Sequence, residues 1–179
     1  EPGTYNVREV MQEGWVCTWP NADGCYYDED FGNGAWVTGN DFGNTPPKTE
    51  TNTLLYKVVG TVGGGDDITL PPANNAVMLG DYVYDTAVVS SVAGTPTGNV
   101  QFKYLAPGGT WTNLGAEVAL AEGIATSPSI QVNTAGTWYF QACYLGGGVF
   151  TPSESGLEDE PLVVLYEDLA VTKTVDTSF

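Results

Sequence analysis

Residues 82–106 read YVYDTAVVSSVAGTPTGNVQFKYLA, two strand-like runs separated by a turn of Gly, Thr and Pro residues. In the first run Val83, Asp85 and Ala87 share one face, because successive side chains of a strand point to opposite sides. An inward Asp85 would need a hydrogen-bond partner or a cation such as Lys57 or Lys103. Similar runs recur about every ten residues, which predicts a β-sandwich. The candidate strands are LLYKVVGTV, DITL, YVYDTAVVSSV, GNVQFKYLA, AEVALA, TSPSIQV, TWYFQACYL and PLVVLY, which span residues 54–166.

The composition also favours an all-β fold with many turns. Apolar residues make up 42% of the 179 residues, 23 residues are Gly and 11 are Pro, and helix-forming stretches rich in Ala, Leu, Glu and Lys are missing. A chain of this length holds one large or two small domains with a real core.

The charge argues against polyanionic partners. There are 22 acidic and 5 basic residues, a net charge of −17. Such a surface repels nucleic acid and anionic lipid. The acidic residues are spread along the chain, which fits a solvated surface, bound calcium or a saline habitat. We expect no nucleic-acid partner and no membrane insertion.

Residues 1–45 predict a second, smaller antiparallel β unit. Four short runs, YNVREV, GWVCTW, CYYDEDF and AWVTGNDF, are separated by Gly, Asn and Pro. About forty residues make a poor independent core, so this unit is expected to borrow a strand or to pack on its neighbour. Its first run places Tyr5, Val7 and Glu9 on one face as a candidate acceptor strand. Residues 46–53 are polar and contain Pro, which predicts a linker.

The three cysteines and the absence of histidine limit the kinds of chemistry that we expect of this chain. Cys17 and Cys25 flank a turn-forming stretch, which predicts a hairpin disulfide and an oxidising, extracytoplasmic setting; two free thiols are the alternative. Cys143 is left over. If Trp138 and Phe140 face the core, Cys143 faces solvent or a partner and could crosslink subunits; an inert thiol is the alternative. With no His, the commonest general base and metal ligand is absent, so we expect no enzyme.

The C-terminal stretch 167–179 predicts one more strand. Leu169, Val171, Lys173 and Val175 share one face of DLAVTKTVD. No partner strand lies near it in the sequence, and an unpaired strand edge is either covered or used for assembly. The chain begins with Glu and has no apolar stretch long enough for a signal peptide or a membrane span, so we expect a processed or excised piece.

The larger unit resembles the bacterial and archaeal Ig-like repeats of surface and secreted proteins. The resemblance rests on ordered motifs over more than half of the chain. They are Gly80, the Asp-Thr-Ala tract 85–87, the Thr-Pro-Thr-Gly turn 95–98, Phe102 and Tyr104, and the Ala-Gly-Thr turn 135–137 before an aromatic strand. It implies an Ig-like sandwich.

The opening segment is similar to the end of prealbumin-like repeats of the collagen-adhesin B type. The matching residues are Gly3, Tyr5, Glu9, Gly14, Trp15 and the stretch 41–44 (DFGN). The first strands of such a domain do not precede them, and the stretch 169–176 (LAVTKTVD) resembles the opening strand of a following repeat. The resemblance therefore implies a partial prealbumin-like unit that is completed by a strand from elsewhere.

Some repeats of that type contain an intramolecular amide between a lysine on the first strand and an asparagine on the last, helped by a buried glutamate. The resemblance assigns these roles to Lys173, Asn44 and Glu9, if the tail of one subunit lies beside the opening strands of another. A desolvated lysine is a neutral nucleophile, and a carboxyl kept protonated by burial can polarise the asparagine carbonyl. The alternative is that Glu9 is partly buried and hydrogen-bonded, with Lys173 exposed.

Two further groups of residues could form binding sites, and each also has a purely structural explanation. Asp28, Glu29 and Asp30, with Asp23 and Asp41, could supply oxygen ligands for calcium, but they lack the spacing of an EF-hand loop and equally fit a solvated turn. The aromatic residues of the small unit could bind sugars or could pack across strands. They are Trp15, Trp19, Tyr26, Tyr27 and Trp36.

The sequence therefore predicts an extracellular structural protein on the cell surface. It would be a filament subunit, or a stalk or adhesion segment, assembled head-to-tail by donor-strand complementation. Its partners would be copies of itself or adjacent repeats of a longer chain, with no cofactor unless calcium binds. The alternative is a carbohydrate- or protein-binding module of a secreted protein.

Overall fold

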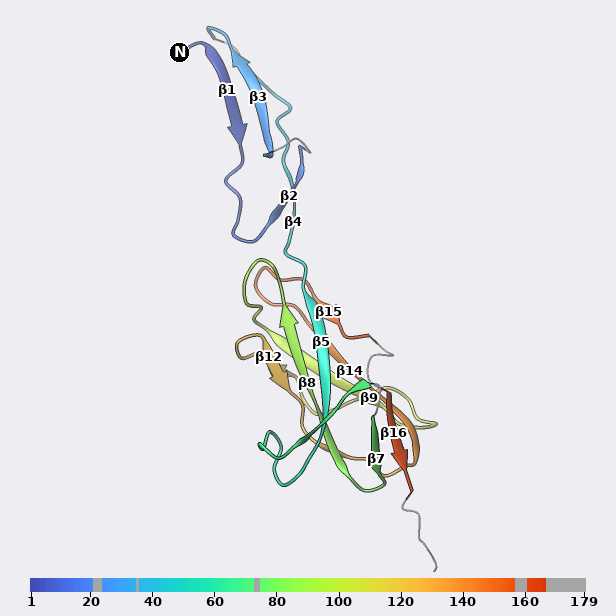
Figure 1. Cartoon of the computed structure of the whole chain (residues 1–179). Coiled ribbons are helices and arrows are strands. Elements are labelled where there is room, and N and C mark those ends of the chain that lie inside the picture. Colours follow the sequence, from blue (N-terminus) through green and yellow to red (C-terminus); the bar gives the residue numbers. More distant parts are fainter. Residues whose placement is uncertain (21–23, 35, 73–74, 157–160, 167–179) are drawn as a thin grey trace, which may run out of the picture.

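The protein is all-β. The computed structural model describes residues 1–20, 24–34, 36–72, 75–156 and 161–166, and no α-helix occurs among them. The elongated molecule in Figure 1 has a small unit at the N-terminal end and a larger sandwich below it. The strands of the sandwich follow most of the runs that the sequence predicts.

One sheet of the sandwich is built around its longest antiparallel pair. Strand β5 (Glu50–Lys57) pairs with β8 (Tyr82–Ser90) over eight residue pairs, from Glu50 opposite Ser90 to Lys57 opposite Val83. The sheet order is β12-β8-β5-β6, and β13 also pairs with β8. The remaining strands are β6 (Ile68–Leu70), β12 (Ile124–Thr126) and β13 (Ile130–Gln131).

The second sheet has the order β10-β9-β14-β16-β7, with β11 on β9 and β15 on β14. Its centre is β14 (Gly136–Tyr144), and its pairs are antiparallel except that β7 runs parallel to β16. The other strands are β7 (Ala76–Met78), β9 (Asn99–Leu105), β10 (Thr112–Asn113), β11 (Val118–Ala119), β15 (Ser153–Glu154) and β16 (Pro161–Leu165).

The core lies between these two sheets. Each inward side chain comes from the alternating pattern of its strand, and fully burying a large apolar side chain contributes roughly 1.5–3 kcal/mol. The buried cluster consists of Leu55, Leu70, Val77, Val83, Ala87, Val89, Val100, Phe102, Leu114, Ala125, Val132, Trp138, Phe140, Ala142, Tyr144, Leu162 and Val164. All of these residues belong to the sandwich.

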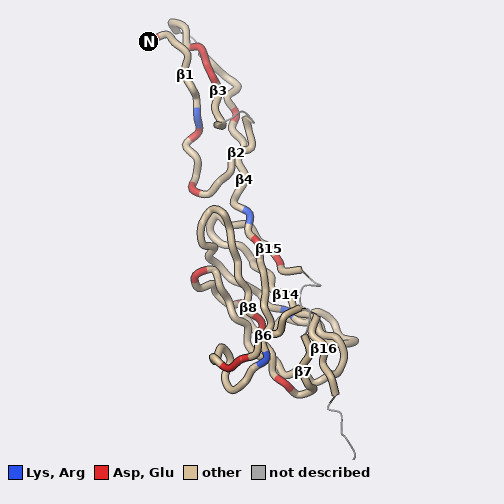
Figure 2. The backbone as a smooth tube through the Cα atoms, in the orientation of Figure 1, with Lys and Arg blue, Asp and Glu red and all other residues tan. Residues whose placement is uncertain are grey.

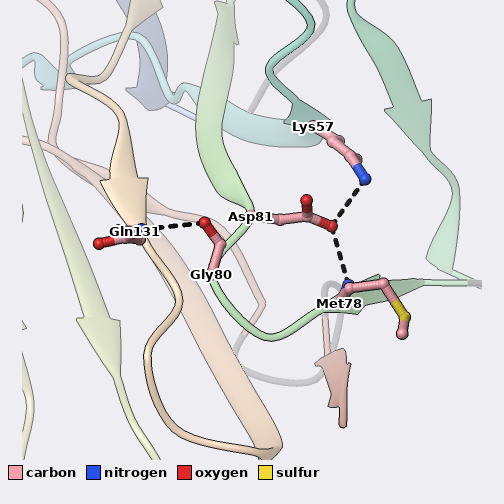
Figure 3. Close-up of polar contacts among 5 residues, drawn as sticks. All are labelled: Lys57, Met78, Gly80, Asp81 and Gln131. Carbon is pink, nitrogen blue, oxygen red and sulfur yellow. Dashed lines mark hydrogen bonds and ion pairs between the residues drawn. The ribbon is translucent and has the colours of Figure 1, made fainter. Parts of the chain in front are cut away.

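Asp85 points inward, as the alternation predicts, and is 1% exposed. Its backbone is held by Ser127, because the Asp85 N–H donates to Ser127 Oγ at 2.9 Å and the Ser127 N–H donates to the Asp85 carbonyl at 2.8 Å. Lys57 forms an ion pair with Asp81 at 2.7 Å. Figure 3 shows that Asp81 also accepts the Met78 N–H, so one carboxylate joins β5 to the turn before β8.

The small unit consists of two separate two-stranded ribbons. In one, β1 (Gly3–Arg8) pairs with β3 (Tyr26–Phe31); in the other, β2 (Val16–Trp19) pairs with β4 (Gly43–Thr45). Among the described residues from 1 to 46, just Pro20 is buried. The described part of this unit therefore has no apolar core.

The fourth strand of the small unit is not where the sequence predicted it. The run AWVTGNDF alternates, but residues 36–42 form no strand, and β4 lies directly after it. Alternation alone does not make a strand when no neighbouring backbone is available for pairing. Glu9 likewise follows the end of β1 instead of lying within it.

The connection between the units is held against the sandwich. Pro47 is buried, and its carbonyl accepts hydrogen bonds from the N–H and the hydroxyl of Thr151 at 3.2 and 3.1 Å. The Ser91 hydroxyl donates to the Lys48 carbonyl at 2.8 Å. Strand β5 begins at Glu50, inside the stretch 46–53 that the sequence predicted as a linker, because those backbone groups find partners on β8.

Acidic residues occur in both units. Figure 2 shows Asp and Glu on the ribbons of the small unit and on the loops of the sandwich, with few Lys or Arg between them. This agrees with the distribution read from the sequence, in which no single segment collects the negative charge.

Candidate functional site

The strongest candidate site lies where the two ribbons of the small unit meet. The Asn44 Nδ2 group donates a hydrogen bond of 2.6 Å to Glu9 Oε2. Asn44 is on β4, whereas Glu9 follows β1, so this bond joins one ribbon to the other. The two residues are separated by 35 positions, and the structure brings together the pair that the adhesin resemblance selected.

A cavity of about 200 Å³ opens beside this pair and is lined by Glu9, Gln12, Trp15 and Asn44. Two buried polar atoms of the cavity, Asn44 Oδ1 and Trp15 Nε1, have no hydrogen-bond partner in the described structure. Leaving a buried donor or acceptor unpaired costs about 1–3 kcal/mol. The residues that line the cavity thus include a carboxylate, an acceptor without a donor and a donor without an acceptor.

The chemistry of these atoms selects the group that would fit. An amine can donate to Asn44 Oδ1 and to the Glu9 carboxylate, while a backbone carbonyl can accept from Trp15 Nε1. A β-strand that carries a lysine supplies both groups. Sequence reasoning selected Glu9 and Asn44 but left Trp15 between sugar binding and packing across strands, and no sequence signal marked Gln12.

The candidate acceptor strand has one open edge in the described structure. Tyr5 and Val7 lie on β1, which pairs with β3 along one side. Tyr5 is 46% exposed and makes an edge contact with Phe31, with ring centroids 5.6 Å apart. The predicted donor residues Leu169, Val171, Lys173 and Val175 lie outside the described residues.

Cys17 and Cys25 form the predicted disulfide, but not within a hairpin, because β2 pairs with β4 and β3 pairs with β1. It connects β2 to the residue before β3, so it links the two ribbons covalently. Cys17 is also the cross-strand neighbour of Asn44. A structural disulfide is typical of proteins outside the reducing cytosol.

Cys143 does not face solvent, contrary to the expectation from alternation. Phe140 and its same-face neighbours are in the core as predicted, but the opposite face of β14 is covered too, and Cys143 is 4% exposed. Glu154 of β15 lies opposite it. Burial raises the pKa of the Cys143 thiol, which makes it a poor nucleophile.

The acidic run of β3 takes part in pairing the first ribbon. Asp28 accepts a hydrogen bond from Asn6, and Asp30 accepts one from Thr4, both across the β1–β3 pair. Asp41 offers its backbone carbonyl to the Tyr27 hydroxyl at 2.7 Å. Asp23 lies outside the described residues, and among the described ones no group of three His, Cys, Asp or Glu side chains gathers to hold a metal.

The aromatic residues divide into two groups. The tyrosines pack across strands: Tyr27 makes an edge contact with Phe42, and Tyr26 lies 4.9 Å from the Arg8 guanidinium. Trp19 and Trp36 are 57% and 89% exposed. Cross-strand packing thus accounts for the tyrosines and leaves these two tryptophans unexplained.

Comparisons with known proteins give no relative from which the role of this site can be inferred. In the part of the chain that the structure describes, no helix is long and apolar enough to span a membrane. No protein-family model, curated protein or solved structure matches this chain.

Proposed function

We propose that this chain is an extracellular structural protein, a filament subunit or a stalk segment of a surface adhesin, whose small unit is completed by a lysine-bearing β-strand. The observation that carries the proposal is the Glu9–Asn44 cavity with its two unpaired polar atoms. It lies between two open ribbons that share no core. Completion by an added strand would satisfy the cavity and the ribbons together.

The exposed apolar side chains of the small unit support an added strand. They are Tyr5, Val10, Met11, Val16, Trp19 and Trp36, which are 37–96% exposed. A two-stranded ribbon is marginal in water by itself, and three or more strands with a buried face are needed for stability. A third strand along a ribbon edge would provide both backbone partners and apolar cover.

The donor that fits by sequence is the segment 169–175 of a second copy. Its alternation places Lys173 on the same face as Leu169, Val171 and Val175, so one lysine would enter the cavity with aliphatic neighbours. A donor at one end and an acceptor at the other make a heterologous contact that does not close on itself. Such contacts build head-to-tail fibres.

A covalent bond could follow at the same site. The Lys173 amine would attack Asn44 Cγ, a new C–N bond would form, and the Asn44 amide nitrogen would leave as ammonia. Glu9 already accepts a hydrogen bond from that nitrogen and is placed to carry protons from the amine to the leaving group. No external oxidant or cofactor is needed, since the products are one amide and one ammonia.

Assembly of the full chain tests this function. We expect concentration-dependent light scattering and fibres in negative stain for the wild type, and loss of both for Asn44→Ala and for Lys173→Ala. Asn133→Ala, at an exposed asparagine of the sandwich, is the matched control and should assemble normally. A wild-type chain that stays monomeric at high concentration rejects the filament subunit and leaves the stalk segment, and intact mass shows whether ammonia is lost.

Sugar binding is the second candidate, because Trp36 and Trp19 expose flat aromatic faces. A glycan array with the full chain would support it by a saturable signal that Trp36→Ala removes. Absence of any saturable signal would reject it without affecting the assembly proposal.

A further inference from the structure

A second cavity adjoins the lysine-accepting one. It measures about 170 Å³ and shares Glu9 with the first cavity. Its other walls include the Cys17–Cys25 disulfide, the Met11 thioether and the Phe42 ring. These groups make it mainly apolar, in contrast to the polar Glu9–Asn44 cavity.

The two cavities are adjacent, because Glu9 lines both of them. The first is lined by Asn44 and the second by Phe42, two residues earlier. Side chains on one face of an incoming strand are also two residues apart, about 6.6 Å along its axis. A strand whose lysine enters the first cavity therefore presents its next same-face side chain near the second.

We propose that the apolar cavity between Met11, Phe42 and the disulfide is a specificity site for the donor strand, which accepts an aliphatic side chain two residues from the lysine. This inference rests on the proposed strand complementation. The occupant is the segment 167–179 of a second copy, in which both residues two positions from Lys173 are valines. A donor parallel to the 42–44 segment places Val171 in the cavity, and an antiparallel donor places Val175 there.

The lining also explains what the site rejects. A polar side chain in this cavity would lose water without gaining a full set of hydrogen bonds. Arg8 and Glu9 line the cavity as well, with the Arg8 guanidinium over the Tyr26 ring, so its charged groups are of both signs. The polar cavity selects the lysine, and the apolar one selects the strand register, because a slip of one residue turns both side chains away.

The disulfide gives the site its dependence on oxidation. It forms part of the cavity wall and joins β2 to the residue before β3. Reduction would remove this covalent link and allow the two thiols in the wall to move apart. Donor binding should therefore weaken in reductant even though no cysteine contacts the lysine.

The test measures, by fluorescence anisotropy, how a fluorescent synthetic peptide of residues 167–179 binds to the full chain with Lys173→Ala, a variant that is not expected to donate its own strand. Peptides carry Thr in place of Val171 or of Val175, and a Thr172→Ser peptide, changed on the opposite face, is the control. We expect one valine peptide to bind about tenfold more weakly, as the loss of one buried aliphatic group predicts, and the control to bind unchanged.

A second experiment changes the sizes of two side chains to test whether the sensitive valine occupies this cavity. Leu at the sensitive valine position should weaken binding to the Lys173→Ala chain, and adding Met11→Ala should restore it by enlarging the cavity. Met11 is 37% exposed, so this variant leaves the fold intact. Equal binding of wild-type and both Thr peptides would overturn the inference, as would a Leu peptide that Met11→Ala does not rescue. A wild-type peptide that fails to bind at all would instead reject the proposed function.

Discussion

The sandwich and the small unit use similar sequence patterns with opposite results. Both contain short alternating runs rich in aromatic and β-branched residues. In the sandwich two sheets cover each other, and the apolar faces enclose one core. In the small unit the ribbons do not cover each other, and Tyr5, Val16 and Trp19 stay exposed. Alternation therefore creates an apolar face, but only a second layer turns that face into a core.

The largest expected difference between the units concerns large aromatic side chains. Phe102→Ala, at a residue with 0% exposure, should destabilise the sandwich by about 3–5 kcal/mol, because it leaves a cavity between the sheets. Trp36→Ala, at a residue with 89% exposure, should change the free energy of unfolding by about 0.5 kcal/mol or less. Urea denaturation, monitored by fluorescence, measures the free energy of unfolding of both variants. Similar losses for Phe102→Ala and Trp36→Ala would contradict the expected difference between the two units.

Removal of the disulfide should affect the small unit alone. A Cys17→Ser, Cys25→Ser double variant no longer closes this short loop covalently. The unfolded chain then gains entropy, which should lower the free energy of unfolding by about 2–3 kcal/mol. Hydrogen exchange should accelerate in residues 1–46 and stay unchanged in β8 and β14. Loss of protection in the sandwich would show that the two units fold as one.

A smaller effect is expected at the ion pair that joins β5 to the β7–β8 turn. Asp81→Ala removes the Lys57 contact and leaves the Met78 N–H without its acceptor, which should cost about 1–2 kcal/mol. Asp81→Asn keeps an acceptor for that N–H and should cost about 0.5 kcal/mol, since an ion pair that water still reaches contributes little. Equal losses in urea denaturation would mean that charge, and not the hydrogen bond, matters.

The smallest effect is the pH dependence of the loop after β5. A hydrogen bond from the Val59 N–H lowers the pKa of Asp67, and the Gly63 N–H adds to it. Because the folded pKa is the lower one, the contribution of Asp67 is present above the unfolded value of about 3.9 and is lost as the pH falls through the folded value.

Asp67→Asn should therefore lower the urea midpoint at pH 5 but have a smaller effect near pH 2. Asp66→Asn, at the neighbouring exposed aspartate, is the matched control. If the difference in urea midpoint between wild type and Asp67→Asn does not shrink on acidification, the Asp67 carboxylate is not the cause of the pH dependence.

The fold class and most sandwich strands could be predicted because local alternation and turn residues are sufficient there. The pairing of β8 and β14 with their neighbours follows from faces that have to be buried. The positions of β4 and Cys143 could not be predicted in the same way. β4 depends on which backbone lies beside β2, and the burial of Cys143 depends on β15, which the sequence does not mark as a strand.

The candidate site was predicted in part. Family resemblance selected Glu9 and Asn44, which are 35 residues apart, and the structure places them in hydrogen-bond contact. The unpaired Trp15 Nε1 and the apolar second cavity have no sequence signal, because both arise from how two separate ribbons approach each other. The role of Lys173 stays a prediction.

The eight paired residues of β5 and β8 have a mechanical consequence. Strand β5 begins at the end of the sandwich next to the small unit, and β16 ends at the opposite end, as Figure 1 shows. A pull between those ends runs nearly along the strands, so the hydrogen bonds of β5 would be loaded together in shear instead of being opened one at a time. A pull between the two ends would therefore be resisted by many of these hydrogen bonds at the same time.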